Sequence, residues 1–250
     1  MKKRRLFSLF LSFALLLPLF SLTSADAYED FTLDAKAGLL IEADTGEILY
    51  EKNAHQENFP ASLTKVMVAL LVFEAIDEGK IALTDSVTAT ESAFEGLSSD
   101  GSTANIVPGE TMTVEQLLNC MLIVSANEAC NILGETLYGS VDAFVARMNE
   151  RAAELGCEHT HFANATGLHN SQHYTTAWDL YLITREALKH DKFMEICNSK
   201  SYTVPATNMT DKPRELHSTN FLISNWRARG YVYRDAQGIK TGSTPEAGYC

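Results

Sequence analysis

Apolar positions along the chain repeat with two different periods. Short apolar-rich stretches at 37–43 and 47–52 flank an Asp-Thr-Gly sequence at 44–46, which is typical of a turn, so this part predicts an N-terminal hairpin. From 61 to 78 the apolar residues recur at helical spacing instead, and Gly79 supplies a stop. We therefore expect a hairpin followed by a largely buried helix.

The middle of the chain is predicted to be mostly helical. A capping box at 113–116 precedes an apolar run, and a Gly-Ser pair at 139–140 separates two helices, the second of which runs to Leu155. A further helix is expected over 177–190, because a Thr-Thr pair precedes it and Asp179 lies in its first turn.

Two segments nearer the C-terminus, 201–204 and 237–241, are predicted to be extended. Strands near both ends with helices between them indicate an α/β (α+β) fold, in which an antiparallel sheet from both termini carries a helical insertion. The chain has no internal repeat, low-complexity tract or obvious interdomain linker.

The N-terminal segment, residues 1–27, has a pattern of its own. Four basic residues precede an uncharged apolar run at 6–22, and an Ala-Asp-Ala sequence follows, which is the layout of a secretory signal peptide. An uncleaved membrane anchor is the alternative, but Pro18 interrupts a run that is already near the lower length limit for spanning a bilayer. We expect 28–250 to form a single exported domain, or one domain with an inserted subdomain, secreted into the cell envelope or held at the outer face of the cytoplasmic membrane.

The predicted mature domain is strongly acidic. Residues 1–27 contain four basic residues and one acid, so the rest of the chain carries a formal net charge of −15, against −12 for the whole. A surface of this charge repels polyanions. Nucleic acid and anionic lipid surfaces are therefore poor candidates for partners.

The chain has five cysteines, an odd number for an exported protein, and none of them forms a CxxC pair. Because a free cysteine behaves as a small buried hydrophobe, we expect most of them to pack in the core. The alternative is a disulfide between two of them, Cys120 and Cys130. The others are Cys157, Cys197 and Cys250.

The first candidate for chemistry is an SxxK segment formed by Ser62 and Lys65. A spacing of three residues at the start of a helix puts both side chains on one face. A serine hydroxyl is a weak nucleophile unless a base removes its proton, and a neutral lysine can do so. The first helical turn adds free N–H groups and the positive end of the helix dipole, which stabilise developing negative charge. Alone, however, the motif is common in helices with a solvated lysine.

Two further motifs follow in the order that this chemistry requires. Ser125 and Asn127 form an SxN sequence after an apolar helix, and Lys240, Thr241 and Gly242 form a KTG sequence on a predicted strand. Each is a weak signal alone, because SxN is typical of a turn and KTG of a strand end. The three together, in this order and context, indicate a serine acyl-transfer enzyme.

With these motifs the chain resembles the serine D-alanyl-D-alanine carboxypeptidases among the low-molecular-mass penicillin-binding proteins, which are related to the serine β-lactamases. The resemblance implies a β-lactamase/penicillin-binding transpeptidase-like fold. It also implies a cell-wall hydrolase and peptidase, acting on peptidoglycan stem peptides that end in D-Ala-D-Ala, inhibited by β-lactam antibiotics, without a cofactor, and contributing to peptidoglycan synthesis and cell shape. It extends over nearly all of 28–250, including 43–46, 49–52, 60–65, 113–118, 164–168, 173–180, 218–220 and 238–248.

The resemblance implies a catalytic role for three residues. Ser62 attacks the carbonyl between the two terminal D-alanines, Lys65 accepts its proton, and Ser125 relays a proton to the leaving amine. We expect the cationic Lys240 and a low-dielectric cleft to keep Lys65 neutral enough to act as a base.

The resemblance also implies how the substrate is held. Lys240 and Thr241 bind the free carboxylate of the last D-alanine, and Asn127 holds the peptide amide or orients the general base. The backbone N–H groups of Ser62 and Ser243 form the oxyanion hole.

Three features depart from the pattern of the family. Ala126 stands where many relatives have glycine, and Ser243 replaces a bulkier residue. In the related fold two further strands and a helix follow the KTG strand, whereas this sequence stops at Cys250. We expect 28–250 to be a catalytic domain truncated at its C-terminal end, poorly folded and inactive alone, because an unpaired KTG strand has nothing to hold it opposite Ser62. Membrane contact is expected only through the signal segment or a missing C-terminal tail.

Four alternatives to the carboxypeptidase interpretation have to be considered. A β-lactamase of class A adds a glutamate in an ExxLN sequence, which this chain lacks. A transpeptidase differs only in the nucleophile that captures the acyl-enzyme, and a catalytically silent envelope protein binds peptidoglycan or penicillin without turnover. A metal site is disfavoured, because no HExxH sequence is present and the histidines lack zinc-site spacing. These are His159, His161, His169 and His173.

Overall fold

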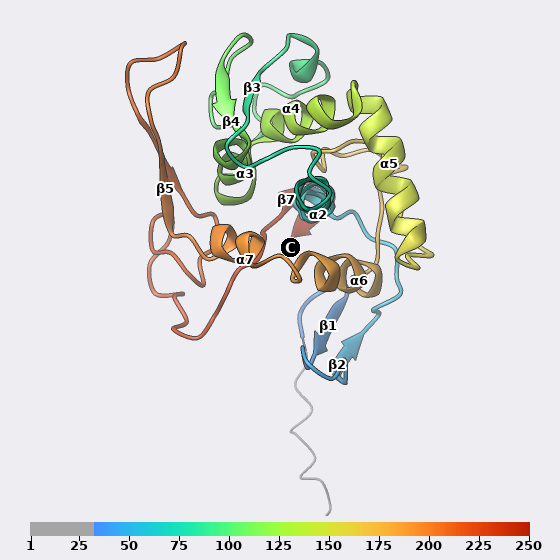
Figure 1. Ribbon diagram of the computed structural model, residues 1–250. Coiled ribbons are helices and arrows are strands. Elements are labelled where there is room, and N and C mark those ends of the chain that lie inside the picture. The colour runs from blue at the N-terminus through green and yellow to red at the C-terminus, as the bar shows by residue number, and fades with distance from the viewer. Residues whose placement is uncertain (1–32) are drawn as a thin grey trace, which may run out of the picture. The chain divides into compact units, whose positions relative to one another are not determined.

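The computed structural model describes residues 33–250, of which 36–250 form one compact unit (Figure 1). The predicted signal peptide at 1–27 and its cleavage site lie outside the described residues. Within the described part of the chain, no helix is long and apolar enough to cross a membrane.

The predicted helix over 61–78 forms the centre of the unit. It opens with one 3₁₀ turn, η2 (Ala61–Thr64), and continues as α2 (Lys65–Asp77), in which every residue from Lys65 to Phe73 is buried. A helix that is apolar all round has to be surrounded. Figure 1 views α2 end-on, with other helices around it, and α2 contacts α3, α4, α5 and α6.

The helices in the middle of the chain follow the prediction. Helix α3 (Val114–Ile123) begins with the capping box, in which Thr113 and Gln116 exchange hydrogen bonds of 2.9 and 3.2 Å. Helix α4 (Asn127–Tyr138) ends at Gly139, whose φ of 80° suits a glycine, and α5 (Val141–Glu154) begins at the Ser140 cap.

The segment after residue 176 differs from its prediction. In place of one helix over 177–190, α6 (Ala177–Ala187) is followed by a second short helix, α7 (Asp191–Cys197). His190 is extended between them, with φ −100° and ψ 104°. Seven residues are too few for a helical period to show, so the sequence did not indicate α7.

The strands within residues 33–250 form four separate two-stranded antiparallel sheets rather than one sheet from both termini. The predicted N-terminal hairpin and the extended segment 201–204 are confirmed. The pairs are β1 (Gly38–Ile41) with β2 (Ile48–Lys52), β3 (Ser86–Thr88) with β4 (Thr111–Thr113), β5 (Ser201–Val204) with β6 (Arg214–His217), and β7 (Ser243–Thr244) with β8 (Gly248–Tyr249).

The predicted strand over 237–241 is wrong, because regular pairing starts only after it. Gly242 exchanges backbone hydrogen bonds of 3.0 and 2.9 Å with Cys250, and β7 and β8 continue that ladder. A strand is defined by its partner, and the described chain supplies one from Gly242 onward. The expectation that the KTG segment would lack pairing is therefore wrong for Gly242, whereas Lys240 and Thr241 belong to no strand of the described chain.

All five cysteines are free, and four of them are buried, so the core-packing prediction is confirmed and the alternative Cys120–Cys130 disulfide does not form. Burial raises the pKa of the Cys120 thiol to about 12 and that of Cys130 to about 11. Such thiols are poor nucleophiles at neutral pH.

Candidate active site

The nucleophile candidate, Ser62, lies in the 3₁₀ turn before α2, on backbone that a second segment holds closely. Ala61 has a φ of +47°, which is unusual for a residue with a side chain. Gly167 packs against it so tightly that an added Cβ would lie 1.9 Å from the Ala61 carbonyl oxygen. The Asn164 side chain shapes this approach by accepting hydrogen bonds from the N–H groups of Thr166 and Gly167.

Lys65 connects three parts of the site. Its Nζ lies 2.9 Å from Ser62 Oγ, 2.9 Å from Asn127 Oδ1 and 2.6 Å from the Thr166 carbonyl oxygen. The side chain is fully buried. Spacing placed Ser62 and Lys65 together in the sequence, whereas the contacts to Asn127 and Thr166 join segments far apart in the chain.

The protonation of Lys65 follows from its surroundings. Burial lowers the pKa of Lys65 below its usual value, and the nearby Cys130 and Glu128 offset part of this effect. A neutral amine has two N–H donors and one lone pair. Since Asn127 Oδ1 and the Thr166 carbonyl can only accept, the donors suit them, and the lone pair is left for the Ser62 hydroxyl.

His173 supports the turn that carries Ser62. Its Nδ1 accepts the Ala163 N–H at 3.1 Å, so Nε2 carries the proton and donates to Thr64 Oγ1 at 2.7 Å. Thr64 Oγ1 donates in turn to the Ala61 carbonyl oxygen at 2.8 Å. Burial lowers the pKa of His173 to about 4, which keeps the ring neutral at physiological pH. His173 therefore has a structural role in this turn.

Ser125 is held in an unusual conformation with an unused hydroxyl. Its φ is 66°, and its buried Oγ has no hydrogen-bond partner among the described residues. The neighbouring Ala126 has φ −55° and ψ 121°, an ordinary conformation for a residue with a side chain. The alanine at this position therefore strains nothing, and the SxN backbone is fixed by Asn127 N–H, which donates to Ser102 O at 2.9 Å.

The KTG segment lies next to Ser62. A Cβ added to Gly242 would lie 3.2 Å from Ser62 N and 3.1 Å from the Pro60 carbonyl oxygen, so the two backbones nearly touch. Lys240 donates to the Thr241 carbonyl at 2.7 Å, and Thr241 Oγ1 lies 2.7 Å from Thr219 Oγ1.

The two lysines are electrostatically linked. Burial, and then the proximity of Lys65, lower the pKa of Lys240 to about 7. The effect runs from Lys65 to Lys240, whereas the pKa of Lys65 is lowered by burial, as one half of the expectation for Lys65 had it. A bound anion beside Lys240 would favour its charged form.

A cavity of about 260 Å³ opens beside Ser62. Three of the predicted site residues line it, namely Ser62, Asn127 and Ser243. Lys65, Ser125, Lys240 and Thr241 lie outside its lining. Sequence reasoning assigned no role to the loop around Gly101, to Thr166 or to Thr219, although the segments of the last two were part of the family resemblance.

No group of three or more His, Cys, Asp or Glu side chains that could hold a metal ion occurs within residues 33–250. Three of the four histidines considered for such a site have other partners, His173 being the one described above. His159 lies 3.2 Å from Glu57, and His161 contacts the Gln172 carbonyl.

A serine hydroxyl beside a buried lysine, at the first turn of a central helix, is the arrangement of enzymes in which a lysine activates a serine nucleophile. A family model described as D-alanyl-D-alanine carboxypeptidase matches residues 23–250. The chain belongs to this family.

Relatives of known name agree with this assignment. The chain is 40% identical over 217 residues to the D-alanyl-D-alanine carboxypeptidase DacF of Bacillus subtilis, a match that covers 87% of this chain and 53% of that protein. It is 33% identical over 223 residues to DacC of Escherichia coli, covering 87% and 52%. The chain thus spans about half the length of these curated relatives.

Solved structures show the same fold. The Streptomyces K15 DD-transpeptidase superposes with a TM-score of 0.78 at 31% identity, over 89% of this chain and 85% of that one. DacD of Francisella tularensis superposes with a TM-score of 0.77 at 25% identity, over 93% and 67%. The chain therefore has the penicillin-binding, β-lactamase-like DD-peptidase fold.

Proposed function

We propose that this chain is the catalytic part of a serine D-alanyl-D-alanine carboxypeptidase. It removes the terminal D-alanine from peptidoglycan stem peptides through an acyl-enzyme on Ser62, and β-lactams acylate the same serine. The observation that carries the proposal is the contact of Ser62 Oγ with Nζ of the fully buried Lys65 at 2.9 Å. The family of the chain supplies the substrate class.

In this mechanism Lys65 takes the proton of Ser62 as the hydroxyl attacks the scissile carbonyl. Two acceptors fix the orientation of the amine, so its lone pair is aimed before substrate arrives. Ser125 then passes a proton to the departing D-alanine amine. Its buried hydroxyl supports this role, because it has no competing partner in the described chain.

Negative charge develops on the carbonyl oxygen during attack. We assign its stabilisation to the backbone N–H groups of Ser62 and Ser243, which lie on the two backbones that Gly242 brings into contact. Each such donor is worth about 3 kcal/mol of barrier. Water then hydrolyses the acyl-enzyme, whereas a β-lactam keeps its leaving group attached and blocks that step.

The free carboxylate of the last D-alanine is assigned to Lys240 and Thr241. With a pKa lowered to about 7, Lys240 is only partly charged in the empty site, and carboxylate binding would draw a proton onto it. Asn127 holds the peptide amide or keeps Lys65 in place. Its 2.9 Å contact with Lys65 supports the second role.

The test is intact-mass spectrometry of the chain after exposure to a fluorescent penicillin, with Ser62→Ala as the matched control. A stable adduct on the unaltered chain, absent from the control, is the expected outcome, followed by release of D-alanine from a D-Ala-D-Ala peptide. Neither adduct nor release from a folded chain would refute the proposal.

Transpeptidation is a second candidate, favoured by the structural similarity of this chain to the Streptomyces K15 DD-transpeptidase. It differs only after acylation, when an amine in place of water captures the acyl group. Adding a glycyl or diamino-acid acceptor to the peptide assay separates the two, because a cross-linked product forms only if an amine competes with water.

We further propose that the chain is exported, with cleavage after residue 27. The basic, apolar and small-residue pattern of 1–27 supports this. N-terminal sequencing of the protein recovered from the cell envelope would show a start near Tyr28, and an intact N-terminus there would indicate an anchor instead.

A further inference from the structure

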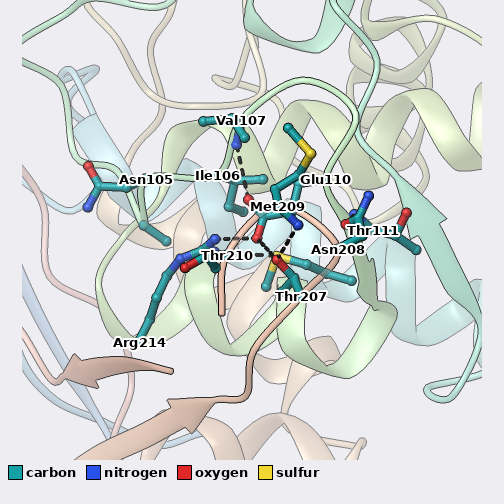
Figure 2. Close-up of polar contacts among 12 residues, drawn as sticks. Asn105, Ile106, Val107, Glu110, Thr111, Thr207, Asn208, Met209, Thr210 and Arg214 are labelled. Carbon is teal, nitrogen blue, oxygen red and sulfur yellow. Dashed lines mark hydrogen bonds and ion pairs between the residues drawn. The ribbon is translucent and has the colours of Figure 1, made fainter. Parts of the chain in front are cut away.

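Glu110 is a buried acid outside the candidate site. Its side chain has no exposed surface, and Arg214, whose side chain is 17% exposed, pairs with it. The carboxylate also accepts hydrogen bonds from Thr207 Oγ1 at 2.7 Å and from Val107 N at 3.2 Å (Figure 2). A buried carboxylate is costly unless it is paired and hydrogen-bonded, so these contacts hold their segments together.

A neighbouring side chain joins the same two segments. Asn208 lies beside Thr111 (Figure 2), and its Oδ1 accepts the Thr111 N–H at 2.8 Å. Its Nδ2 donates to the Gly109 carbonyl at 2.8 Å. The amide thus pairs with the chain entering β4 much as a strand would. These contacts fix the tip of the β5–β6 hairpin to the segment before α3. We refer to Glu110, Thr207, Asn208 and Arg214 as the tip latch.

The hairpin is fastened at both ends of α3. Glu110 lies directly before β4, and β4 ends at Thr113, the N-cap of α3. The ion pair with Glu110 therefore holds Arg214, the first residue of β6, near the N-terminus of α3. At the other end Thr219 N–H donates to the carbonyl of Ile123, the last residue of α3, at 3.2 Å. The ten residues of α3 rise about 15 Å. The extended run from Arg214 to Thr219 covers about 17 Å. The two spans are therefore similar in length, so the run from Arg214 to Thr219 can be tied to both ends of α3 in the observed register.

That register decides where Thr219 and Asn220 lie. Thr219 Oγ1 lies 2.7 Å from Thr241 Oγ1, and Asn220 Nδ2 donates to the Gly238 carbonyl at 2.5 Å. Residues that follow β6 therefore contact the chain at Thr241, within the KTG segment, and at Gly238, just before it. A slip of one residue would move this support by about 3.3 Å and turn alternate side chains to the opposite face.

We propose that Glu110, Asn208 and Arg214 are positioning residues that set the register of β6 along α3 and thereby hold Thr241 and Lys240 where a substrate carboxylate binds. The tip latch acts through the hairpin and touches no substrate. The part of the proposal that concerns the carboxylate rests on the proposed function, whereas the part that concerns register does not.

Two variants and one control separate this role from general stability. Asn208→Ala removes the two backbone contacts of an exposed side chain. The double variant Glu110→Gln/Arg214→Met removes both charges together, so no buried charge is left unpaired. The control is Glu215→Gln, which alters an exposed residue of β6 that contacts Thr203 on β5 but not the latch.

The first readout is amide hydrogen exchange at Ser218 and Thr219, whose N–H groups donate to Lys200 O and Ile123 O. We expect exchange about tenfold faster in both latch variants and within about twofold of the unaltered chain in the control. Faster exchange confined to 205–213, with Thr219 unchanged, would overturn the proposal. This readout needs no enzymatic activity.

The second readout is the kinetics of a peptide that ends in D-Ala-D-Ala. We expect KM to rise about tenfold in the latch variants while kcat changes by less than about threefold, since ground-state binding of the carboxylate is what is lost. A fall in kcat alone, or equal effects in the control, would contradict this role. If the unaltered chain neither turns over the peptide nor is acylated by penicillin, the proposed function fails, and the exchange data still decide whether the latch sets the register.

Discussion

Lys65 has no exposed surface and three polar partners, and these two facts limit what it can do. A charged ammonium in this position loses its hydration, which is why burial lowers its pKa. A neutral amine satisfies Asn127 and Thr166 as acceptors and leaves its lone pair to Ser62. Lys240, nearby, has its own pKa lowered to about 7, and its proposed task requires the opposite protonation state. The proposed mechanism therefore requires the two lysines to be in different protonation states.

This difference predicts a bell-shaped pH profile for kcat/KM with a D-Ala-D-Ala peptide. The rate rises with pH while Lys65 loses its proton, because only the neutral amine is a base, and it falls above about pH 7 while Lys240 loses the charge that binds the carboxylate. In Lys240→Arg the guanidinium stays charged, so the falling limb should disappear over the range from pH 7 to 9. A falling limb unchanged by that substitution would assign it to another group.

The spacing of residues along the chain predicted only those contacts of the site that join near neighbours in sequence. Ser62 and Lys65 meet because three residues of helical rise separate them. The contacts of Lys65 with Thr166 and of Thr241 with Thr219 join segments that only the complete fold brings together. No spacing rule indicates such pairs, and the family resemblance supplied the segments without the contacts.

At the scale of elements, the long helices were predictable and the short strands were not. Helices α3, α4 and α5 carry both a helical period and a recognisable cap or stop. Strands β3 and β4 have three residues each, and β7 and β8 have two, too few for an alternating pattern. Their positions come from tertiary contacts, such as the close approach of Gly242 to the turn before α2.

The close approach of Gly167 to the turn before α2 predicts that a larger residue at position 167 would displace that turn. In Gly167→Ala the new Cβ would meet Ala61 O at 1.9 Å, at a φ of +84°, so the turn carrying Ser62 has to move. We expect a loss of about 3 kcal/mol or more in unfolding free energy, and slower acylation by penicillin. The measurement is urea unfolding together with the acylation rate.

Gly139→Ala is the matched control for this substitution. Its φ is similar, at +80°, but nothing lies within 4 Å of an added Cβ. It should cost only about 1 kcal/mol, from backbone strain alone. Equal losses in the two variants would show that the contact with Ala61 is unimportant.

Across the whole molecule, the described unit is held by a helical core in which four free thiols are buried. They lie on or next to α3, α4, α5 and α7, so each one is located in a different part of the core. They are Cys120, Cys130, Cys157 and Cys197.

The burial of four of the five cysteines predicts how many thiols react quickly in the native chain. With an aromatic disulfide reagent at pH 8, the native chain should show one fast-reacting thiol, Cys250, because it is exposed and the other four are buried. Accessibility makes the difference, since desolvation raises the pKa of Cys250 as well. In denaturant all five should react. Two or more fast thiols in the native chain would mean that part of the core is open.

The labelling rates of the four buried cysteines also report how often the core opens locally. Each can be modified only when the surrounding helix packing opens, so the rate at which a given cysteine is labelled measures the opening frequency of that region. Cys130 follows the SxN segment on α4, while Cys197 ends α7 beside Gly238. Comparing their labelling rates with and without penicillin would show whether the region of α4 or that of α7 opens less often when Ser62 is acylated.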